Sequence, residues 1–209
     1  MEASRICDLL ASFLGSVRLT SSQIEQISIY LDLLLRWNAK TNLTAIRDPE
    51  EMVRRHFGES LFAATHLYSG EPSGQERLID FGSGAGFPGI PIKIYASELH
   101  VTLIESQNKK ATFLREVIRA LGLKDIQVHA GRAEGSGLVA KTVTMRAVEK
   151  FEQSLPMAVS LLDQNGRLAL LIGAGQVEKA RSLVPSLQWS ELVRIPGSAE
   201  RVLFVGEKR

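Results

Sequence analysis

The chain has 209 residues, of which 44% are apolar and 23% are charged, and its formal net charge is +2. This composition is typical of a soluble globular protein with a sizeable core, and so small a net charge does not by itself indicate a nucleic-acid partner. A single cysteine excludes an internal disulfide, and the longest apolar run, 168–174, is too short to span a bilayer. Because no signal peptide is recognisable at the start, we expect a cytoplasmic protein that does not associate with membranes.

The first third of the chain has the periodicity of amphipathic helices. Apolar residues recur every three or four positions in three segments, at 6–14, 22–37 and 49–66. Ser22 followed by Glu25 is the pattern of a capping box at the start of the second segment. Asp48 is a favoured N-cap residue, and the proline after it is favoured at the first position of a helix. We therefore predict three helices in this region.

The pattern changes after a polar segment at 69–76, which is rich in glycine, proline and serine and is predicted to be a loop. Beyond it, short apolar runs alternate with helical patterns such as 109–121, which ends at Gly122. The runs typical of strands are 78–81, 101–105, 126–128, 142–145 and 168–172. We expect residues 1–68 to be a helical extension that packs on a core domain formed by residues 77–209.

Two more strand candidates lie near the end of the sequence, at 192–195 and 201–205. The segment between them is too short for a crossover helix, so these two strands must run antiparallel. The earlier strands alternate with helices, which predicts a parallel sheet covered on both faces. The predicted fold is thus α/β, with a Rossmann-like, mostly parallel, seven-stranded sheet that ends in an antiparallel hairpin. This arrangement is similar to that of class I S-adenosylmethionine-dependent methyltransferases.

A glycine-rich segment follows the first predicted strand. Asp80 lies near the end of that strand, and Gly82, Gly84, Gly86 and Gly89 come after it. Glycines let the backbone turn sharply and approach a ligand closely, and ligands of open α/β sheets bind at such strand ends. We therefore predict a cofactor site at this turn, with Asp80, Gly82 and Gly84 among its residues.

Two cofactors fit this pattern. Residues 84–89 match the G-x-G-x-x-G dinucleotide fingerprint, and Glu105 lies near the distance expected for a ribose-binding acid. However, the carboxylate of Asp80 offers nothing to a pyrophosphate, and Phe87 with Pro88 replaces the small residues on which a pyrophosphate would lie. S-adenosylmethionine carries no phosphate. We therefore favour this methyl donor over NAD, with Glu105 as the acceptor of hydrogen bonds from its ribose hydroxyls.

Further motifs follow one another along the chain. They are Trp37-Asn38, residues 41–52, Arg55-His56, residues 59–61, residues 80–91, Glu105-Ser106, Lys109-Lys110, Phe113-Leu114, residues 121–123 and Arg132-Ala133-Glu134. Read together, they resemble the motifs of the ribosomal RNA small subunit methyltransferase G family, and the similarity covers nearly the whole chain. The resemblance implies methylation of guanine N7 in small-subunit (16S) ribosomal RNA, with S-adenosylhomocysteine as the product and no metal.

The resemblance also implies which residues bind the methyl donor. These are Gly82, Phe87, Glu105, Ala133, Glu134 and Arg146. Because guanine N7 has a free lone pair, no base has to remove a proton, and catalysis can rest on alignment of the reacting atoms. We therefore name no catalytic general base. The four histidines are scattered, without the spacing of metal ligands.

RNA is expected to be bound mainly through its phosphates, by lysine and arginine side chains. The candidates for RNA contact are Arg47, Arg54, Arg55, His56, Lys109 and Lys110. A flipped guanine would also need a stacking surface, for which we name Phe87 and Trp37. We expect a monomer, because no apolar helical stripe is left without a core to join.

The chain departs from the family pattern at two predicted strand ends. Met145 stands where a serine is usual and Ile172 where a lysine is usual, and we expect both side chains to face the site. Two alternatives to an active rRNA methyltransferase therefore stay open. One is a donor-binding and RNA-binding paralogue with weak activity. The other is an NAD-dependent oxidoreductase, which rests on the glycine fingerprint alone.

Overall fold

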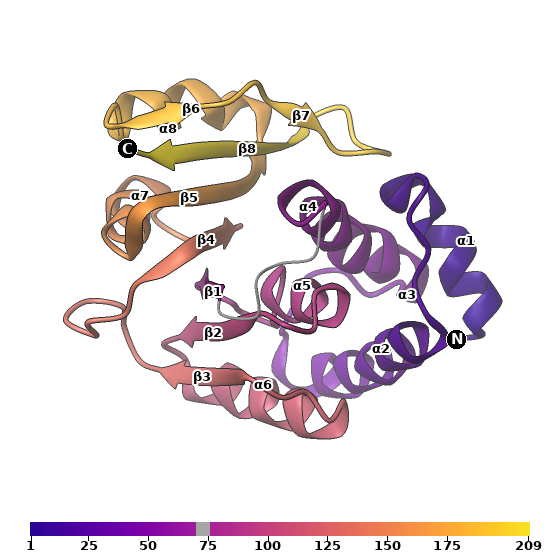
Figure 1. The fold of residues 1–209 in the computed structure, drawn as a ribbon. Helices are drawn as coiled ribbons and strands as arrows, with labels where there is room; N and C mark the ends of the chain where they lie inside the picture. Colours follow the sequence, from indigo (N-terminus) through magenta and orange to yellow (C-terminus); the bar gives the residue numbers. More distant parts are fainter. Residues whose placement is uncertain (70–75) are drawn as a thin grey trace.

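The structure is a computed structural model that describes residues 1–69 and 76–209 (Figure 1). The segment predicted to be a loop, 69–76, lies outside the described residues except for its two ends. The helices are α1 (Ala3–Leu14), α2 (Ser21–Thr41), α3 (Pro49–Met52), η1 (Val53–Gly58), α4 (Glu59–Leu67), α5 (Gly89–Tyr95), α6 (Asn108–Ala120), α7 (Phe151–Ser160), η2 (Ala174–Gln176) and α8 (Val177–Leu183). Within these described residues, no helix is both long enough and apolar enough to cross a membrane.

The second predicted helix, α2, begins with a capping box, but not the predicted one. The side chain of Thr20 accepts a hydrogen bond from the N–H of Gln23, and the side chain of Gln23 accepts one from the N–H of Thr20. The box predicted at Ser22 and Glu25 was therefore wrong by two residues. Both positions already lie inside the helix, where their backbone groups follow its geometry.

The third predicted helix is one continuous helical segment from Pro49 to Leu67, made of α3, η1 and α4. Asp48 caps it as predicted, since its carboxylate accepts a hydrogen bond from the N–H of Glu51 at 2.7 Å. The middle part, η1, is a π-helix, a wider turn that is frequent at functional sites. It carries Arg54, Arg55 and His56, three of the predicted RNA contacts.

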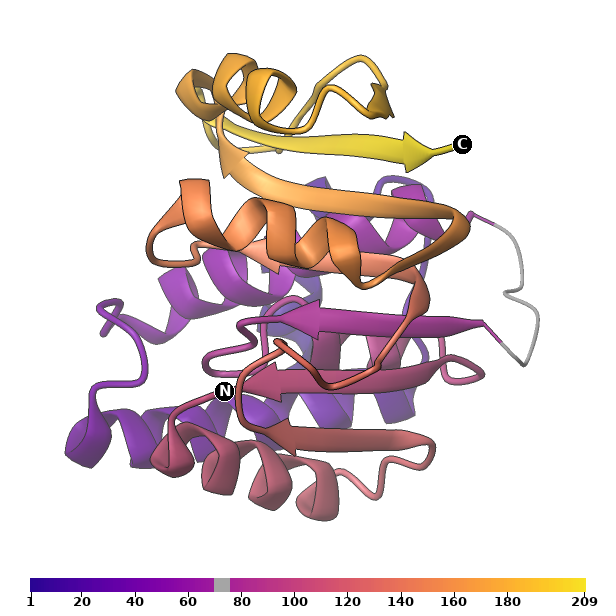
Figure 2. The same cartoon turned by 90° about the vertical axis from the view of Figure 1, so that its left-hand side faces the viewer.

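The described strands form one sheet. They are β1 (Arg77–Phe81), β2 (His100–Glu105), β3 (Ile126–Ala130), β4 (Ala140–Arg146), β5 (Leu162–Gly173), β6 (Leu187–Trp189), β7 (Val193–Arg194) and β8 (Arg201–Lys208). The order across the sheet is β3-β2-β1-β4-β5-β8-β6. Strands β1 to β5 run parallel to one another, and β8 is antiparallel to β5, β6 and β7. In Figure 2 the yellow β8 accordingly points the opposite way to the strands below it.

The continuous path of seven strands agrees with the predicted mostly parallel sheet, although one of its members was not predicted. The three-residue strand β6 escaped notice because so short a run shows no periodicity. The predicted strand 192–195 forms only the two-residue β7, which pairs with β8 beside the path. The predicted antiparallel hairpin is therefore present, but the edge of the sheet is β6.

Helices cover both faces of the sheet and bury two hydrophobic clusters. Helices α1 to α6 lie on one side of the sheet, on the right and below in Figure 1, where α4, α5 and α6 contact the strands and α1 and α2 pack on these helices. Their apolar side chains form one cluster with Leu78, Leu103 and Leu171 of the sheet. Helices α7 and α8 pack on the other face, against Val143 and Leu170 among others. The N-terminal helices thus share one core with the sheet, which fixes their position relative to the ends of the strands.

Gly58, the last residue of η1, allows a close contact between this segment and α1. A Cβ atom at this position would lie 2.6 Å from the ring of Phe13, which is too close for two carbon atoms. The ring of Phe13 is itself buried in the core. The glycine is therefore needed for the helices to approach each other as they do.

Replacement of Gly58 with alanine is expected to lower the free energy of unfolding by about 1–3 kcal/mol, because the ring of Phe13 must leave its packed position. Urea unfolding followed by circular dichroism measures this. Gly175→Ala is the matched control, since a Cβ there meets no atom within 4 Å. We expect this second change to stay within about 0.5 kcal/mol. Equal losses in the two variants would contradict the packing argument.

Candidate active site

The carboxyl ends of β1 to β4 meet along one edge of the sheet, on the left in Figure 2. The turn between β1 and α5 lies at this edge. In it, Gly82, Gly84 and Gly86 have φ angles of 70°, 58° and 92°, in the region that favours glycine. The glycines that the sequence singled out therefore form a sharp turn at the strand ends, as predicted.

Two adjoining pockets open along this edge. The first has a volume of about 320 Å³ and the second of about 390 Å³. Both are lined by Gly82, Glu105, Ser106, Val148 and Glu149. The first pocket extends towards the N-terminal helices and is also lined by Thr44, His56, Gly84, Phe87, Lys110 and Arg146. The second extends towards α7 and the end of β3, and is also lined by Ala133 and Glu134. Volumes of this size suit a small-molecule cofactor.

Glu105, the last residue of β2, lies where the two pockets meet. Its Oε2 accepts a hydrogen bond from the N–H of Gly84 at 2.9 Å, and its Oε1 accepts one from the N–H of Gln107 at 2.7 Å. Each carboxylate oxygen has lone pairs for more than one hydrogen bond. Glu105 therefore braces the glycine turn and can still accept hydrogen bonds from the hydroxyls of a ligand.

Asp80 lies beneath the glycine turn and lines neither pocket. Its carboxylate accepts hydrogen bonds from the hydroxyl of Thr144 at 2.8 Å and from the N–H of Gly89 at 3.1 Å. Burial raises the pKa of Asp80 to about 6, although these hydrogen bonds oppose the shift. The side chain ties the turn to β4 and α5, so this geometry gives Asp80 a positioning role in place of the predicted contact with the cofactor.

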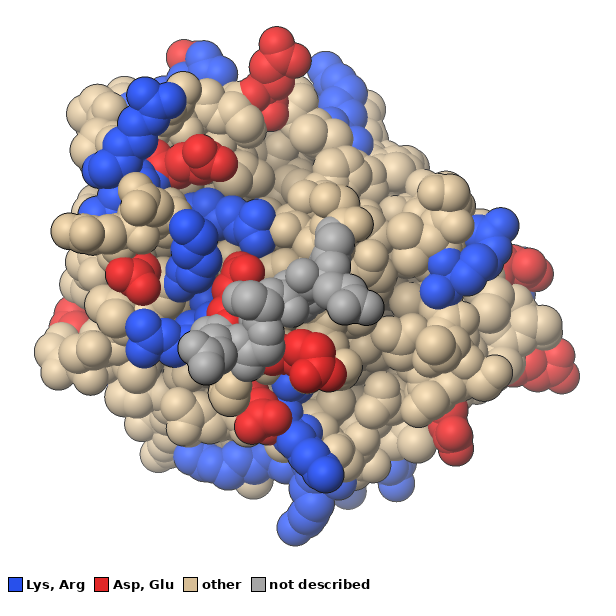
Figure 3. Space-filling view, in the orientation of Figure 1, with Lys and Arg blue, Asp and Glu red and all other residues tan. Residues whose placement is uncertain are grey.

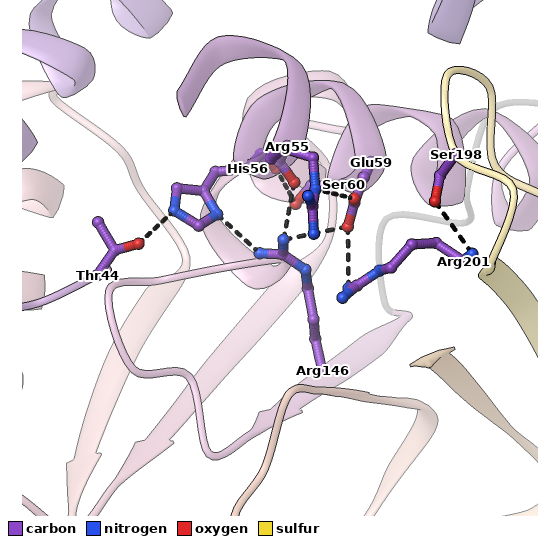
Figure 4. Close-up of polar contacts among 8 residues, drawn as sticks. All are labelled: Thr44, Arg55, His56, Glu59, Ser60, Arg146, Ser198 and Arg201. Atoms are coloured by element: carbon purple, nitrogen blue, oxygen red, sulfur yellow. Dashed lines mark hydrogen bonds and ion pairs between the residues drawn. The ribbon is translucent and has the colours of Figure 1, made fainter. Parts of the chain in front are cut away.

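A buried cluster of charges closes the first pocket on the side of the N-terminal helices (Figure 4). Glu59 has 1% of its side chain exposed and contacts the guanidinium groups of three arginines. The distances are 2.9 Å to Arg55, 3.1 Å to Arg146 and 3.0 Å to Arg201. Three cations and one carboxylate leave an excess of positive charge beside the pocket. The cluster also joins α4 and η1 to strands β4 and β8.

His56 lies between this cluster and the loop that precedes α3. Nη1 of Arg146 is 3.1 Å from its Nδ1, and Oγ1 of Thr44 is 2.8 Å from its Nε2. A guanidinium can only donate, so Nδ1 accepts and a neutral ring carries its proton on Nε2. Burial, together with the charge of the nearby arginines, lowers the pKa of His56 to about 3. His56 is thus a neutral hydrogen-bonding residue in this structure, which does not suit a cationic contact with a phosphate.

Phe87 lines the first pocket but has little free surface. Its ring lies against the rings of Tyr30, His56 and Phe57, with centroid distances of 5.1, 4.8 and 5.1 Å, and Phe87 is only 6% exposed. Trp37, the other predicted stacking residue, lines neither of the two pockets. The structure therefore does not provide the predicted stacking surface for a guanine at either residue.

The other predicted RNA contacts do not form one cluster. Lys110 lines the first pocket and Lys109 is exposed beside it on α6. Arg54 is paired with a glutamate of its own helical segment, and Arg47 donates to the main-chain oxygen of Asn38 at 2.9 Å. Figure 3 shows the opposite face of the molecule, where β1 begins, and there the positive and negative side chains of the described residues are mixed.

Met145 and Ile172 do not face the site, so that expectation was wrong. Both are nearly fully buried, and they belong to the cluster under α7 and α8. Neighbouring residues of a strand point to opposite faces of a sheet. Because Arg146 points towards the N-terminal helices, Met145 must point away from them. These two departures from the family pattern therefore give no reason to expect weak activity.

Two groups at the site were not identified from the sequence as functional. Glu59 was noted only as part of a motif, and Arg201 was not singled out, because it lies 142 residues from its partner. No local pattern connects residues so far apart. Across residues 1–69 and 76–209, no group of three or more His, Cys, Asp or Glu side chains is placed to hold a metal ion.

The strand order, the antiparallel β8 and the site at the ends of β1 and β2 define a class I methyltransferase fold. Solved structures share it. P. horikoshii TYW2 in complex with MeSAdo has a TM-score of 0.59 at 16% identity, over 73% of this chain and 62% of that chain. A ribosomal protein L11 methylase from Lactobacillus delbrueckii subsp. bulgaricus has a TM-score of 0.60 at 16% identity, over 74% and 79%. At these identities the similarity concerns the fold alone.

The sequence comparisons are more specific. Residues 23–199 match the model of the GidB family, rRNA small subunit methyltransferase G. A protein of that name from Xylella fastidiosa (strain M23) is 39% identical over 201 residues, which are 94% of this chain and 92% of the relative. One from Roseiflexus castenholzii is 41% identical over 202 residues, or 90% and 85%. The chain belongs to the rRNA small subunit methyltransferase G family, as its motifs indicated.

Replacement of Glu59 with glutamine is expected to lower the free energy of unfolding by about 3–5 kcal/mol, because the buried side chain of Arg146 and the half-buried one of Arg201 stay in place without their counter-charge. Glutamine has nearly the same size, so no cavity contributes. Urea unfolding at neutral pH measures the loss. The control is Glu50→Gln, which removes a more exposed carboxylate that pairs with two exposed arginines and should cost much less. Similar losses in both variants would show that the cluster is not a buried one.

The pH dependence of stability tests the neutral state of His56. Its folded-state pKa of about 3 lies below the 6.5 of a free imidazole, so between these values the unfolded chain binds a proton that the folded chain does not. This contribution to stability is present above about pH 6.5 and is lost as the pH falls. Between pH 6.5 and 5, His56→Gln should lose stability less steeply than the wild type, by up to about 1.4 kcal/mol per pH unit. Parallel curves from urea unfolding at each pH would contradict this assignment.

Proposed function

We propose that this protein transfers the methyl group of S-adenosylmethionine to N7 of a guanine in small-subunit (16S) ribosomal RNA. The observation that carries the proposal is the pair of pockets that meet at Glu105, in a chain of this family. One pocket is available for the methyl donor, and the other, which adjoins it on the side of the N-terminal helices, is available for a nucleobase. The methyl donor and the guanine would then meet where the two pockets join.

The residues present fit the methyl donor. Ala133 and Glu134 would contact the adenine in the second pocket, and Glu105 would accept hydrogen bonds from the ribose. The backbone of Gly82 would lie along the donor, since a Cβ at Gly82 would approach Val148 to 3.0 Å and narrow this passage. Arg146 lies further into the first pocket. When bound, the donor supplies a methyl group on a positively charged sulfur.

Methyl transfer to guanine N7 requires mainly that the reacting atoms be aligned. Guanine N7 carries a lone pair that is available without loss of a proton, so the chain needs no general base at this position. The neutral His56 agrees with this requirement, as does the buried Asp80, which is kept away from the pockets by its own hydrogen bonds. The residues of the first pocket then act by holding the base and by excluding water.

For the RNA we propose contacts with phosphates through Lys109, Lys110, Arg47, Arg54 and Arg55. Lys110 is the best placed of these, because it lines the pocket in which the base would lie. The excess positive charge around Glu59 adds to the attraction of a polyanion. We further propose that the protein acts as a monomer, in the cytoplasm.

A nicotinamide-dependent oxidoreductase is not favoured. Its only support was the glycine fingerprint, and Phe87 and Pro88 occupy the part of the turn where a pyrophosphate would rest. Membership of the rRNA small subunit methyltransferase G family favours a methyltransferase instead.

The proposal is tested with small ribosomal subunits from a strain that lacks its own enzyme of this family. Purified protein and labelled S-adenosylmethionine should add label to the 16S rRNA, and nucleoside mass spectrometry should identify it as 7-methylguanosine. Subunits that already carry the modification are the control and should take up no label. Absence of label, or a methyl group on another atom, would refute the proposal.

A variant of Glu105 links this activity to the predicted donor site. Glu105→Ala removes the proposed ribose acceptor and one support of the turn, so the Kd for S-adenosylmethionine should rise about 10- to 100-fold in calorimetry. Glu98→Ala, which changes a carboxylate that lines neither pocket, should leave the Kd unchanged. Equal affinity in both variants would place the donor elsewhere.

A further inference from the structure

Thr44 is held rigidly at the first pocket by a buried residue of α2. It lies in the loop between α2 and α3 and lines the pocket. Oδ1 of Asn38 accepts a hydrogen bond from the N–H of Thr44 at 2.9 Å, and Nδ2 of Asn38 donates to the carbonyl oxygen of Ile46 at 3.1 Å. Asn38 is only 2% exposed. Its amide thus fixes the backbone on both sides of Ala45, and with it the direction of the Thr44 side chain.

Two donors fill the acceptor positions of the Thr44 hydroxyl. Nε2 of His56 donates to Oγ1 at 2.8 Å, because Nδ1 already accepts from Arg146. The N–H of Ile46 donates to the same oxygen at 3.2 Å. A hydroxyl oxygen has two lone pairs and one proton to donate. Both lone pairs are used, and within the described part of the chain no acceptor takes the proton, which is left for a group in the pocket.

The direction of these hydrogen bonds is set by the charge cluster (Figure 4). Glu59 can only accept from Arg146, and Arg146 can only donate to His56. The ring of His56 must then donate to Thr44. The series therefore ends in the hydroxyl of a residue that lines the pocket, and this hydroxyl is free to donate but not to accept.

Guanine and adenine differ at the position that such a donor would meet. Beside N7, guanine presents the acceptor O6, whereas adenine presents the N6 amino group, which is a donor. A donating hydroxyl can form a hydrogen bond with O6 of bound guanine. Adenine offers no acceptor at this position, so the same hydroxyl would stay without a partner.

We propose that Thr44 selects guanine as the methyl acceptor, by donating a hydrogen bond from its hydroxyl group to O6 of the base. This inference rests on the proposed function, because it takes N7 as the atom that is methylated. Thr44 is then a specificity-determining residue that touches the substrate, and Arg146 and His56 position it.

The test compares Thr44→Val, which keeps the shape but removes the hydroxyl, with Thr44→Ser, which keeps the hydroxyl. On small subunits that lack the modification, kcat/KM should fall about 10- to 100-fold for Thr44→Val and should be largely retained by Thr44→Ser. The Kd for S-adenosylmethionine should change little in both. The matched control is Thr112→Val, because Thr112 lies on α6 and lines neither pocket.

A second measurement separates recognition of O6 from a structural role of the hydroxyl. Once the modified guanine is mapped, ligated rRNA can carry 2-aminopurine there, a base that keeps N7 and lacks O6. Replacement of guanine by 2-aminopurine should lower the kcat/KM of the wild type more than that of Thr44→Val. The difference should equal the factor by which Thr44→Val lowers kcat/KM on guanine. Equal losses in the two proteins would overturn the inference.

The outcomes distinguish the two proposals. If the wild type forms no 7-methylguanosine, both fail. If it does so and Thr44→Val keeps full kcat/KM, only the role of Thr44 is refuted.

Discussion

The geometry of the site depends on one buried carboxylate. Glu59 lies among three guanidinium groups, which come from η1, β4 and β8. Removal of charges from water is costly unless their partners stay in place, so the N-terminal helices cannot slide on the sheet without separating opposite charges. The first pocket lies between these helices and the ends of the strands. Its shape therefore depends on the ion cluster around Glu59, to which the pocket-lining Arg146 belongs.

The two walls of this pocket are organised in a similar way. On one side, the charge of Glu59 orients Arg146, and through it the ring of His56. On the other side, the carboxylates of Asp80 and Glu105 accept backbone N–H groups of the turn after β1. Each carboxylate thus restrains main chain or side chain that would otherwise be free to rearrange. Because these groups are already restrained before a ligand binds, less conformational entropy is lost on binding.

The sequence was sufficient for the parts of the site that are local. The glycine turn follows one predicted strand and Glu105 ends the next, so their meeting at one edge of a parallel sheet could be foreseen. The orientation of Met145 and Ile172 could not, because a strand end does not reveal which of its two faces is turned to the site. The partners of Glu59 could not be predicted either, since Arg201 is 142 residues away and only the completed sheet brings it near. Family motifs indicated the function, but they did not indicate that His56 is neutral or that Phe87 is covered.

Strand β8 has a further consequence for how the molecule is assembled. It is the last strand of the sequence, yet it lies inside the sheet between β5 and β6 and carries Arg201. During synthesis, the N-terminal helices and the first five strands emerge before this arginine does. Until β8 inserts, β5 is an open edge and Glu59 lacks one of its three counter-charges. A growing chain therefore completes the charge cluster around Glu59 only after β8 has been synthesised.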